Sequence, residues 1–259
     1  MMNNIREFGL IGYPLGHSYS ENYFNSKFET LGLTNFKYHT FPLTDLSKLT
    51  NLIKSHNRLI GLNVTTPYKE AVIPYMNNVD KQVIKTGVVN TVIIKRDADK
   101  VSLNGYNTDV FGIEKTLNEF DLSEVKTAII LGSGGSAKTI KSVLDSKNIE
   151  SKFVSRFPNN GNQIYYRDLN KHLIVRTQLI INATPVGMFP NHGICPDIPY
   201  EHINDKHICI DLVYNPEKTL YLEKCEAMGA QVKNGLAMLY EQADKAWELW
   251  QQEISSLES

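Results

Sequence analysis

The chain has 259 residues, of which 42% are hydrophobic and 21% charged, and its formal net charge at pH 7 is -1. This composition is typical of a globular protein, and the small net charge predicts no nucleic-acid or membrane-surface partner. The N-terminus lacks an apolar signal core and no apolar run reaches membrane-span length, so we expect a cytoplasmic protein without a membrane segment. Three cysteines without Cys-x-x-Cys spacing predict reduced thiols and no metal site.

The first part of the chain alternates between strand-like and helix-like segments. Strands are predicted over residues 8–12, 36–41, 59–64, 88–94 and 101–103, with a charged loop at 95–100, and helices over 21–31, 46–56 and 80–86. Ser20 is a candidate cap for the first helix, and Gly87 is expected to end the last one. This alternation is typical of an α/β unit with a mostly parallel sheet.

A second alternating series follows, led by a predicted helix over residues 110–120. Its predicted strands are residues 127–131, 151–155, 179–182, 207–211 and 230–233, with helices from about 135 to 145 and from 217 to 228. This βαβ series predicts a Rossmann-type dinucleotide-binding domain. The last predicted helix, from 235 to about 255, has apolar residues at helical spacing and either covers the second domain or returns to the first.

The segment 61–70 (GLNVTTPYKE) combines an extended run with an expected helix start. Thr66-Pro67 suits an N-cap followed by the first helical position. Asn63 and Thr65 lie two residues apart on extended chain and therefore point the same way, and Lys69 can lean over that face. An amide, a hydroxyl and an ammonium would then converge on a polyhydroxylated small molecule. The alternative is a surface strand-to-helix turn with a solvated lysine.

A glycine pattern, Gly132-x-Gly134-x-x-Ala137, follows an apolar strand and opens a helix. The first glycine allows a tight turn, the second lets the backbone approach a pyrophosphate, and the helix N-terminus supplies amides. After the next strand an NAD site would offer an acidic residue to the ribose. This chain offers Ser155-Arg156, and a guanidinium there suits a 2′-phosphate. The pattern favours NADP over NAD, and an ordinary exposed loop arginine is the alternative.

Asp109 lies just before a predicted helix, where it is a candidate N-cap. Should Lys69 and Asp109 meet, they would form a proton-transfer pair in which the carboxylate orients the amine. Their spacing in the sequence leaves open whether they meet. In the loop around His17 we expect Ser18 and Ser20 to make the hydrogen bonds. Gln242, a polar residue on the last helix, could reach a ligand.

Seven motifs, in order, resemble those of the shikimate dehydrogenase family, and the similarity covers nearly the whole chain. They are residues 11–20 (IGYPLGHSYS), 63–69 (NVTTPYK), 87–91 (GVVNT), 105–109 (GYNTD), 182–188 (NATPVGM), 211–214 (DLVY) and 234–242 (NGLAMLYEQ). The glycine loop departs from the family in Ser133 and Ser136, where alanines are common. Phe157-Pro158 stands where the family often has a threonine and a basic residue, so Arg156 would rely on Lys138 or Ser133 for help.

The resemblance implies NADP-linked interconversion of 3-dehydroshikimate and shikimate, with Lys69 donating to or stabilising the developing alkoxide. It assigns Lys69 and Asp109 as a catalytic pair that also contacts the substrate. The other implied substrate ligands are Ser18, Ser20, Asn63, Thr65, Asn90, Tyr214 and Gln242. The implied cofactor ligands are Gly132, Ser133, Gly134, Gly135, Ser136, Ser155, Arg156, Thr184, Leu212 and Gly235.

We therefore expect two α/β domains with a cleft between them. A substrate domain would comprise residues 1–107 and the C-terminal helix 235–259, and a Rossmann NADP domain would comprise residues 108–234. The partner would be a small-molecule substrate, and the protein a monomer or homodimer. One alternative is a quinate/shikimate dehydrogenase using NAD, against which the paired serines and Arg156 argue. The other is a non-catalytic nucleotide-binding protein or redox sensor, against which the retention of Lys69 and Asp109 argues.

Overall fold

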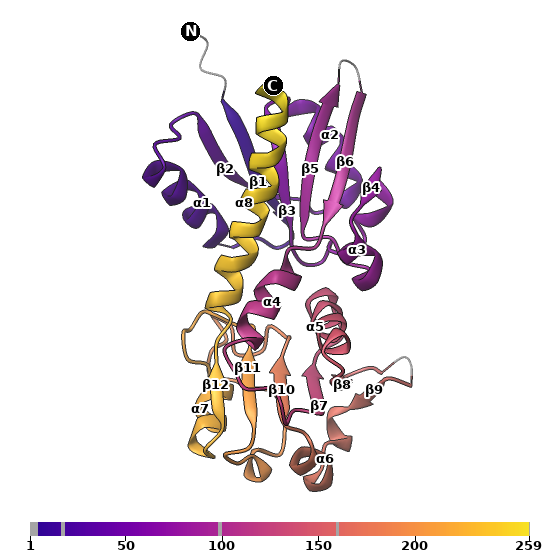
Figure 1. Ribbon diagram of the computed structural model, residues 1–259, viewed down its shortest axis with the longest axis vertical. Helices are drawn as coiled ribbons and strands as arrows, with labels where there is room; N and C mark the ends of the chain where they lie inside the picture. Colours follow the sequence, from indigo (N-terminus) through magenta and orange to yellow (C-terminus); the bar gives the residue numbers. More distant parts are fainter. Residues whose placement is uncertain (1–4, 17–18, 98–99, 159–160, 259) are drawn as a thin grey trace. The chain divides into compact units, whose positions relative to one another are not determined.

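The computed structural model describes residues 5–16, 19–97, 100–158 and 161–258 (Figure 1). The chain forms two compact units: unit 1 comprises Met1–Thr108 and Ala243–Ser259, and unit 2 comprises Asp109–Gln242. The last helix, α8 (Leu236–Glu258), therefore begins in unit 2 and ends in unit 1. The sequence predicts these divisions at 107/108 and 234/235.

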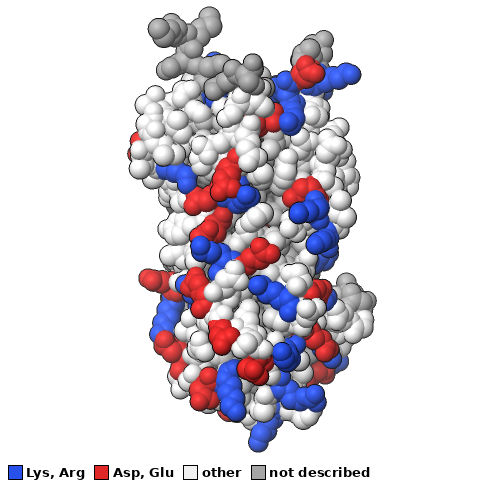
Figure 2. All heavy atoms as spheres, in the orientation of Figure 1, with Lys and Arg blue, Asp and Glu red and all other residues white. Residues whose placement is uncertain are grey.

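Lys and Arg side chains are mixed with Asp and Glu on the visible face, without a large patch of one sign (Figure 2).

Unit 1 is built on a mixed six-stranded sheet with the order β2-β1-β3-β5-β6-β4. Its strands are β1 (Arg6–Gly12), β2 (Phe36–Pro42), β3 (Leu59–Val64), β4 (Asn78–Val79), β5 (Thr91–Asp97) and β6 (Lys100–Tyr106). Among these described strands β5 alone runs opposite to the rest, since it pairs antiparallel with both β3 and β6. The mostly parallel sheet expected from the sequence is confirmed.

Helices cover both faces of the unit 1 sheet. They are α1 (Tyr19–Thr30), α2 (Leu49–Ser55), α3 (Lys81–Thr86) and the later turns of α8, with 3-10 turns at Leu46–Lys48 and Ile73–Tyr75. Trp250 of α8 is fully buried among aromatic rings of β1 and α1, and its Nε1 donates to the Val92 carbonyl at 3.2 Å. A Cβ on Gly61 would lie 2.1 Å from that Nε1, so the indole requires glycine on the strand beneath it.

Unit 2 contains a fully parallel sheet with the order β12-β11-β10-β7-β8-β9. Its strands are β7 (Thr127–Leu131), β8 (Glu150–Ser155), β9 (Gln163–Tyr165), β10 (Leu179–Asn182), β11 (Ile208–Asp211) and β12 (Gln231–Lys233). Its helices are α4 (Asp109–Leu117), α5 (Gly135–Ser146), α6 (Lys171–Arg176) and α7 (Leu220–Ala227), with 3-10 turns at Tyr166–Asp168 and Tyr200–His202. Read from β9, the order is that of the Rossmann fold, which confirms the expectation.

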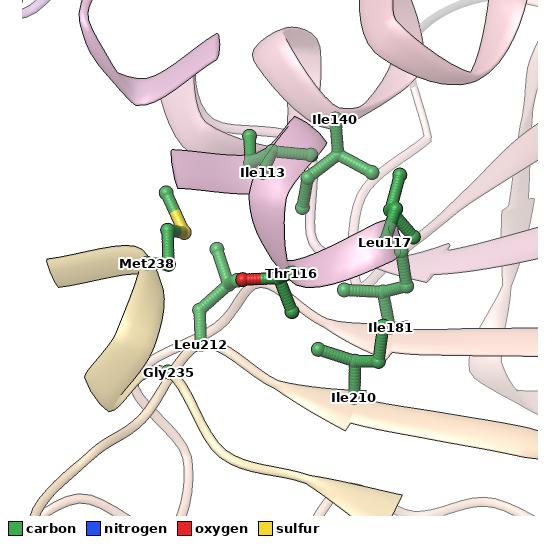
Figure 3. A pocket seen from close by; sticks show the side chains of 9 residues that line it. All are labelled: Ile113, Thr116, Leu117, Ile140, Ile181, Ile210, Leu212, Gly235 and Met238. Atoms are coloured by element: carbon green, nitrogen blue, oxygen red, sulfur yellow. The ribbon is translucent and has the colours of Figure 1, made fainter. Parts of the chain in front are cut away.

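A small apolar cavity lies in the core of unit 2 between α4, α5, β10, β11 and the start of α8 (Figure 3). Its lining residues are Ile113, Thr116, Leu117, Ile140, Ile181, Ile210, Leu212, Gly235 and Met238. The hydroxyl of Thr116 donates to the Gly112 carbonyl of its own helix at 2.9 Å. The cavity therefore offers hydrocarbon rather than directed polar groups, and we assign it to core packing.

Several local expectations are wrong. No α-helix starts at Thr66-Pro67: the peptide bond between them is cis, and a run of turns with bonds such as Val72 N–H to the Tyr68 carbonyl leads to Ile73–Tyr75. A Thr-Pro pair is compatible with a helix start and with a cis turn, so the pattern could not separate them. Ser20 does not precede α1 as its cap but lies in its first turn, because the helix begins at Tyr19 and not at residue 21 as predicted.

The third correction concerns the charged segment 95–100, of which Lys95, Arg96 and Asp97 continue strand β5. The guanidinium of Arg96 donates to the carbonyls of Ile53 and His56, and Lys95 forms an ion pair with Glu253 at 2.6 Å. Because these charges find partners within unit 1, they do not require a loop. The predicted helix 46–56 is also divided, into a 3-10 turn and α2.

Candidate active site

A buried polar network surrounds Asn63, near the carboxyl end of β3. Its Oδ1 accepts a hydrogen bond from the Tyr38 hydroxyl at 2.8 Å. Its Nδ2 donates to Thr91 Oγ1 at 3.1 Å and to the Asn90 carbonyl at 3.3 Å. Asn63 and Thr91 are directly paired across the β3–β5 ladder. The structure thus places a candidate substrate ligand in the sheet interior with its amide held at both ends.

Asn90 extends the network to the residue that precedes Asp109. Its Oδ1 accepts from the Thr108 backbone N–H at 2.7 Å, and its Nδ2 donates to Thr108 Oγ1 at 2.9 Å. Asn63, Asn90, Thr91 and Thr108 are each at most 6% exposed. Buried polar groups are destabilising unless they are hydrogen-bonded, and this network satisfies them.

Lys69 lies on a turn that is bonded to the same region. Its carbonyl accepts from the Val89 N–H at 2.8 Å, one residue before Asn90. Thr65, two residues after Asn63, is half-buried, and its N–H donates to the Ile11 carbonyl at 2.9 Å. Unit 1 thus brings Asn63, Thr65, Asn90 and the backbone of Lys69 to adjoining strand ends.

The remaining substrate candidates are distributed as follows. Ser18, with His17, lies outside the described residues, and Ser20 is half-buried in α1. Asp109 is 4% exposed and begins α4 in unit 2, so its pairing with Lys69 of unit 1 stays a prediction. Tyr214 and Gln242 are half-buried residues of unit 2, and Gln242 Nε2 donates to the Leu239 carbonyl at 2.9 Å.

The glycine loop of unit 2 follows β7 and begins α5. Gly132 has φ +106°, a conformation that suits glycine, and its N–H donates to the Val154 carbonyl at 2.8 Å. Gly134 is the N-cap of α5, and a Cβ built there would meet no atom within 4 Å. Ser133 precedes this N-cap, and Gly135 and Ser136 are the first two residues of the twelve-residue helix α5. A pyrophosphate fits this helix N-terminus, because the amides and the helix dipole favour an anion.

Ser155 is the last residue of β8, the strand beside β7, and Arg156 follows it. Ser155 Oγ accepts from the Phe157 N–H at 3.2 Å, and the Arg156 side chain is exposed. Burial raises the pKa of the nearby Tyr166, and the positive charge of Arg156 opposes this rise only in part. Because Gly132 bonds to Val154, the basic residue lies close in the fold to the glycine loop. This placement fits a phosphate on the ribose of a dinucleotide.

A second buried network joins the ends of β10 and β11. Asp211 Oδ1 accepts from Asn182 Nδ2 at 2.9 Å and from the Val213 N–H at 3.0 Å, and Oδ2 accepts from Thr219 Oγ1 at 2.6 Å. Burial raises the pKa of Asp211 to about 6, against these hydrogen bonds. Asn182 Oδ1 in turn accepts from Thr184 Oγ1 at 2.6 Å. Asn182 and Asp211 belong to two of the motifs that resemble the family, although no separate role was predicted for either residue.

The remaining cofactor candidates lie along the same sheet edge. A Cβ on Gly132 would come within 3.0 Å of Thr184, and one on Gly235 within 2.1 Å of the Leu212 carbonyl oxygen. The Leu212 N–H donates to the Asn182 carbonyl at 2.9 Å. Gly132, Thr184, Leu212 and Gly235 therefore form a continuous row across the carboxyl ends of β7, β10 and β11, where doubly wound sheets bind their ligands.

Comparisons with known proteins identify the family. A model of the shikimate dehydrogenase substrate-binding domain matches residues 10–92. Shikimate dehydrogenase (NADP(+)) of Staphylococcus aureus strain MSSA476 is 35% identical over 98% of this chain and 95% of its own length. The enzyme of the same name from Methanosphaera stadtmanae is 32% identical over 97% and 93%. The chain belongs to the shikimate dehydrogenase family.

Solved structures agree with this membership. Shikimate dehydrogenase 1 from Peptoclostridium difficile superposes with a TM-score of 0.83 at 36% identity, covering 96% of this chain and 92% of that one. The Thermus thermophilus enzyme, solved with NADP(H) and shikimate, gives 0.81 at 28% identity over 95% and 93%. As a shikimate dehydrogenase family member, the chain is an α/β protein with two mostly parallel sheets, as expected.

The residues that the structure describes contain no group of three or more His, Cys, Asp or Glu side chains arranged to hold a metal ion. Within the same residues, no helix has the length and apolar character needed to cross a membrane. The three cysteines are free thiols.

Proposed function

We propose that the chain catalyses the NADP-linked, reversible reduction of 3-dehydroshikimate to shikimate. The observation that carries this proposal is nearly full-length similarity, above 30% identity, to enzymes named shikimate dehydrogenase (NADP(+)). A Thermus thermophilus relative solved with NADP(H) and shikimate supports the same pair of ligands. The buried amide network of unit 1 and the glycine loop of unit 2 supply the polar groups that these two ligands need.

Substrate recognition is assigned chiefly to unit 1. A cyclohexene carboxylate with several hydroxyls requires many directional hydrogen bonds and a partner for its negative charge. The hydroxyls of Ser18 and Ser20 suit the carboxylate, whereas the amides of Asn63 and Asn90 and the ammonium of Lys69 suit the ring hydroxyls. Thr65, Tyr214, Gln242 and Asp109 complete the proposed set. Unit 1 would thus act as the substrate domain and unit 2 as the NADP domain.

Cofactor recognition is assigned to the carboxyl edge of the unit 2 sheet. The backbone of residues 132–136 would hold the pyrophosphate at the start of α5, and Ser155 and Arg156 would hold the 2′-phosphate. Thr184, Leu212 and Gly235 would line the rest of the dinucleotide. The open space in front of Gly134 and the exposure of Arg156 support this assignment. When bound, NADPH supplies the hydride for the carbonyl carbon.

Lys69 and Asp109 are assigned to the proton. As the carbonyl carbon receives hydride, negative charge grows on its oxygen, and the Lys69 ammonium stabilises that charge and delivers the proton. The carboxylate of Asp109 orients the amine for the transfer. In the reverse direction the neutral amine accepts the hydroxyl proton. Within unit 1, the turn that carries Lys69 is bonded to Val89, and Asn90 is bonded to Thr108, the residue before Asp109.

The proposal is tested with purified protein and the variant Lys69→Ala, with Lys85→Ala, an exposed lysine of α3, as the matched control. The wild-type protein should reduce NADP+ with shikimate. Lys69→Ala should bind NADPH as the wild type does and lose about 10²–10⁴-fold in kcat, whereas the control should keep its activity. Unchanged turnover in Lys69→Ala would remove the lysine from the mechanism. Absence of wild-type turnover with shikimate would reject the function.

We further propose a cytoplasmic location, where free cysteines such as the three of this chain stay reduced. We also propose that the protein is a monomer or a homodimer. Sedimentation equilibrium would distinguish these two states, and a larger assembly would contradict the proposal.

A further inference from the structure

Thr91, the first residue of β5, carries the hydroxyl that links the two amides of the unit 1 network. Its side chain is completely buried. Its Oγ1 lies 3.1 Å from Asn63 Nδ2, 3.2 Å from Asn90 Oδ1 and 3.0 Å from Thr108 Oγ1. One hydroxyl is therefore within hydrogen-bond distance of side chains from the end of β3, the residue before β5 and the segment after β6.

Backbone groups fix the orientation of both amides. The Thr108 N–H can only donate, so the Asn90 atom 2.7 Å from it is the amide oxygen. The Asn90 carbonyl can only accept, so the Asn63 atom 3.3 Å from it is the amide nitrogen. It follows that Asn63 Nδ2 faces Thr91 Oγ1 and that Asn63 Oδ1 faces the Tyr38 hydroxyl.

The hydroxyl hydrogens of Thr91 and Thr108 can then be placed in two ways. Either Thr91 donates to Asn90 Oδ1 while Thr108 donates to Thr91, or Thr91 donates to Thr108 while Thr108 donates to Asn90 Oδ1. Each arrangement links the three oxygens by two hydrogen bonds, and in both Thr91 accepts from Asn63. The Asn63 Nδ2 group therefore has two acceptors, Thr91 Oγ1 at 3.1 Å and the Asn90 carbonyl at 3.3 Å. Thr91 is the nearer of the two and keeps the amide in place.

We propose that Thr91 is a positioning residue for substrate recognition, whose buried hydroxyl holds the Asn63 and Asn90 amides in the orientation that the ring hydroxyls of the substrate require. This inference rests on the proposed function, which makes the two asparagines substrate ligands. With Nδ2 of Asn63 directed to Thr91, the ligand meets the amide oxygen, which has two lone pairs and gives one to Tyr38. Asn63 would then recognise a substrate hydroxyl as its hydrogen-bond acceptor.

The matched pair Thr91→Val and Thr91→Ser tests the proposal. Valine keeps the shape and removes the hydroxyl, whereas serine keeps the hydroxyl and removes a methyl group. Thr91→Val should raise KM for shikimate and the calorimetric Kd for shikimate alone about tenfold, which corresponds to about 1.4 kcal/mol. Its KM for NADP+ should change less than about twofold. Thr91→Ser should restore shikimate binding to near the wild-type value.

A second variant and a control keep the test decisive if Thr91→Val does not fold. Tyr38→Phe removes the donor at the other end of Asn63 and should raise the shikimate KM several-fold with little effect on NADP+. Tyr221→Phe removes an equally buried hydroxyl, which in unit 2 donates to the Ile180 carbonyl at 2.9 Å, and should leave the shikimate KM unchanged.

Two results would overturn the proposal. One is a folded Thr91→Val protein with wild-type KM and Kd for shikimate. The other is equal loss of shikimate and NADP+ binding that serine does not restore, which would mark a purely structural hydroxyl. Failure of the proposed function would look different, because the wild-type protein itself would then neither bind nor oxidise shikimate.

Discussion

Replacing Asp211 by asparagine should remove a pH-dependent loss of stability from unit 2. The Asp211 side chain is fully buried at the end of β11 and accepts three hydrogen bonds, from Asn182, Val213 and Thr219. Burial penalises the charged carboxylate more than these bonds favour it, so its pKa rises from 3.8 to about 6. The native protein therefore holds this proton more tightly than the unfolded chain does.

The sign and size of the effect follow from that difference. Between about pH 4 and pH 6 the native state binds more protons at this site than the unfolded state, so its stability falls as pH rises. A rise in pKa from 3.8 to about 6 corresponds to about 3 kcal/mol at roughly 1.4 kcal/mol per unit. The loss continues as pH rises through about 6 and is complete about one unit above that value. Asparagine stays neutral and should escape it, with its amide oxygen towards Asn182 and Val213.

Urea denaturation of the wild type and Asp211→Asn at several pH values from 4 to 7.5 measures the difference in unfolding free energy. The variant should gain up to about 3 kcal/mol relative to the wild type as pH rises through this range. Asp121→Asn is a control for which the difference in unfolding free energy should change with pH in the opposite direction. The reason is that the Ser123 N–H lowers the pKa of the exposed Asp121 carboxyl. A difference between wild type and Asp211→Asn that does not change with pH would refute the reasoning.

Three further substitutions test separate parts of the structure. Gly61→Ala should displace Trp250 and lower the free energy of unfolding by about 1–3 kcal/mol, and an unchanged Tm would contradict the packing of α8 on the sheet. Gly132→Ala, at φ +106°, should weaken NADPH binding at least about tenfold without changing shikimate affinity, as titration calorimetry would measure. Arg156→Gln should lower kcat/KM for NADP+ about 10–100-fold and leave that for NAD+ nearly unchanged; equal losses would exclude a 2′-phosphate contact.

The Rossmann unit could be predicted from the sequence because its main signals come from residues that are neighbours in the chain. Strand β7 and the start of α5 lie almost where the apolar run and the glycine pattern placed them, since both signals come from neighbouring residues. The short strand β9 and the helix α6 were missed. β9 has three half-exposed or exposed residues, and α6 has one fully buried residue, so neither gives a strong periodic pattern.

Interactions between distant residues set the limit of the sequence reasoning. Asn63 and Asn90 were expected to face a ligand, but their bonds to Thr91 and Thr108 depend on a strand pairing that no local pattern reveals. The same holds for the bond between Asp211 and Asn182, which is the last residue of the neighbouring strand β10. At Thr66-Pro67 the local pattern fitted two structures, and the helical interpretation was wrong. The pairing of Lys69 with Asp109 stays a prediction.

The most direct test of the central claim is the initial rate of NADPH formation by the purified protein with shikimate and NADP+. This rate is to be compared with the rates for quinate and for NAD+. We predict that shikimate with NADP+ gives the highest kcat/KM of the four combinations. A clear preference for quinate with NAD+, or no turnover with any combination, would contradict the assignment.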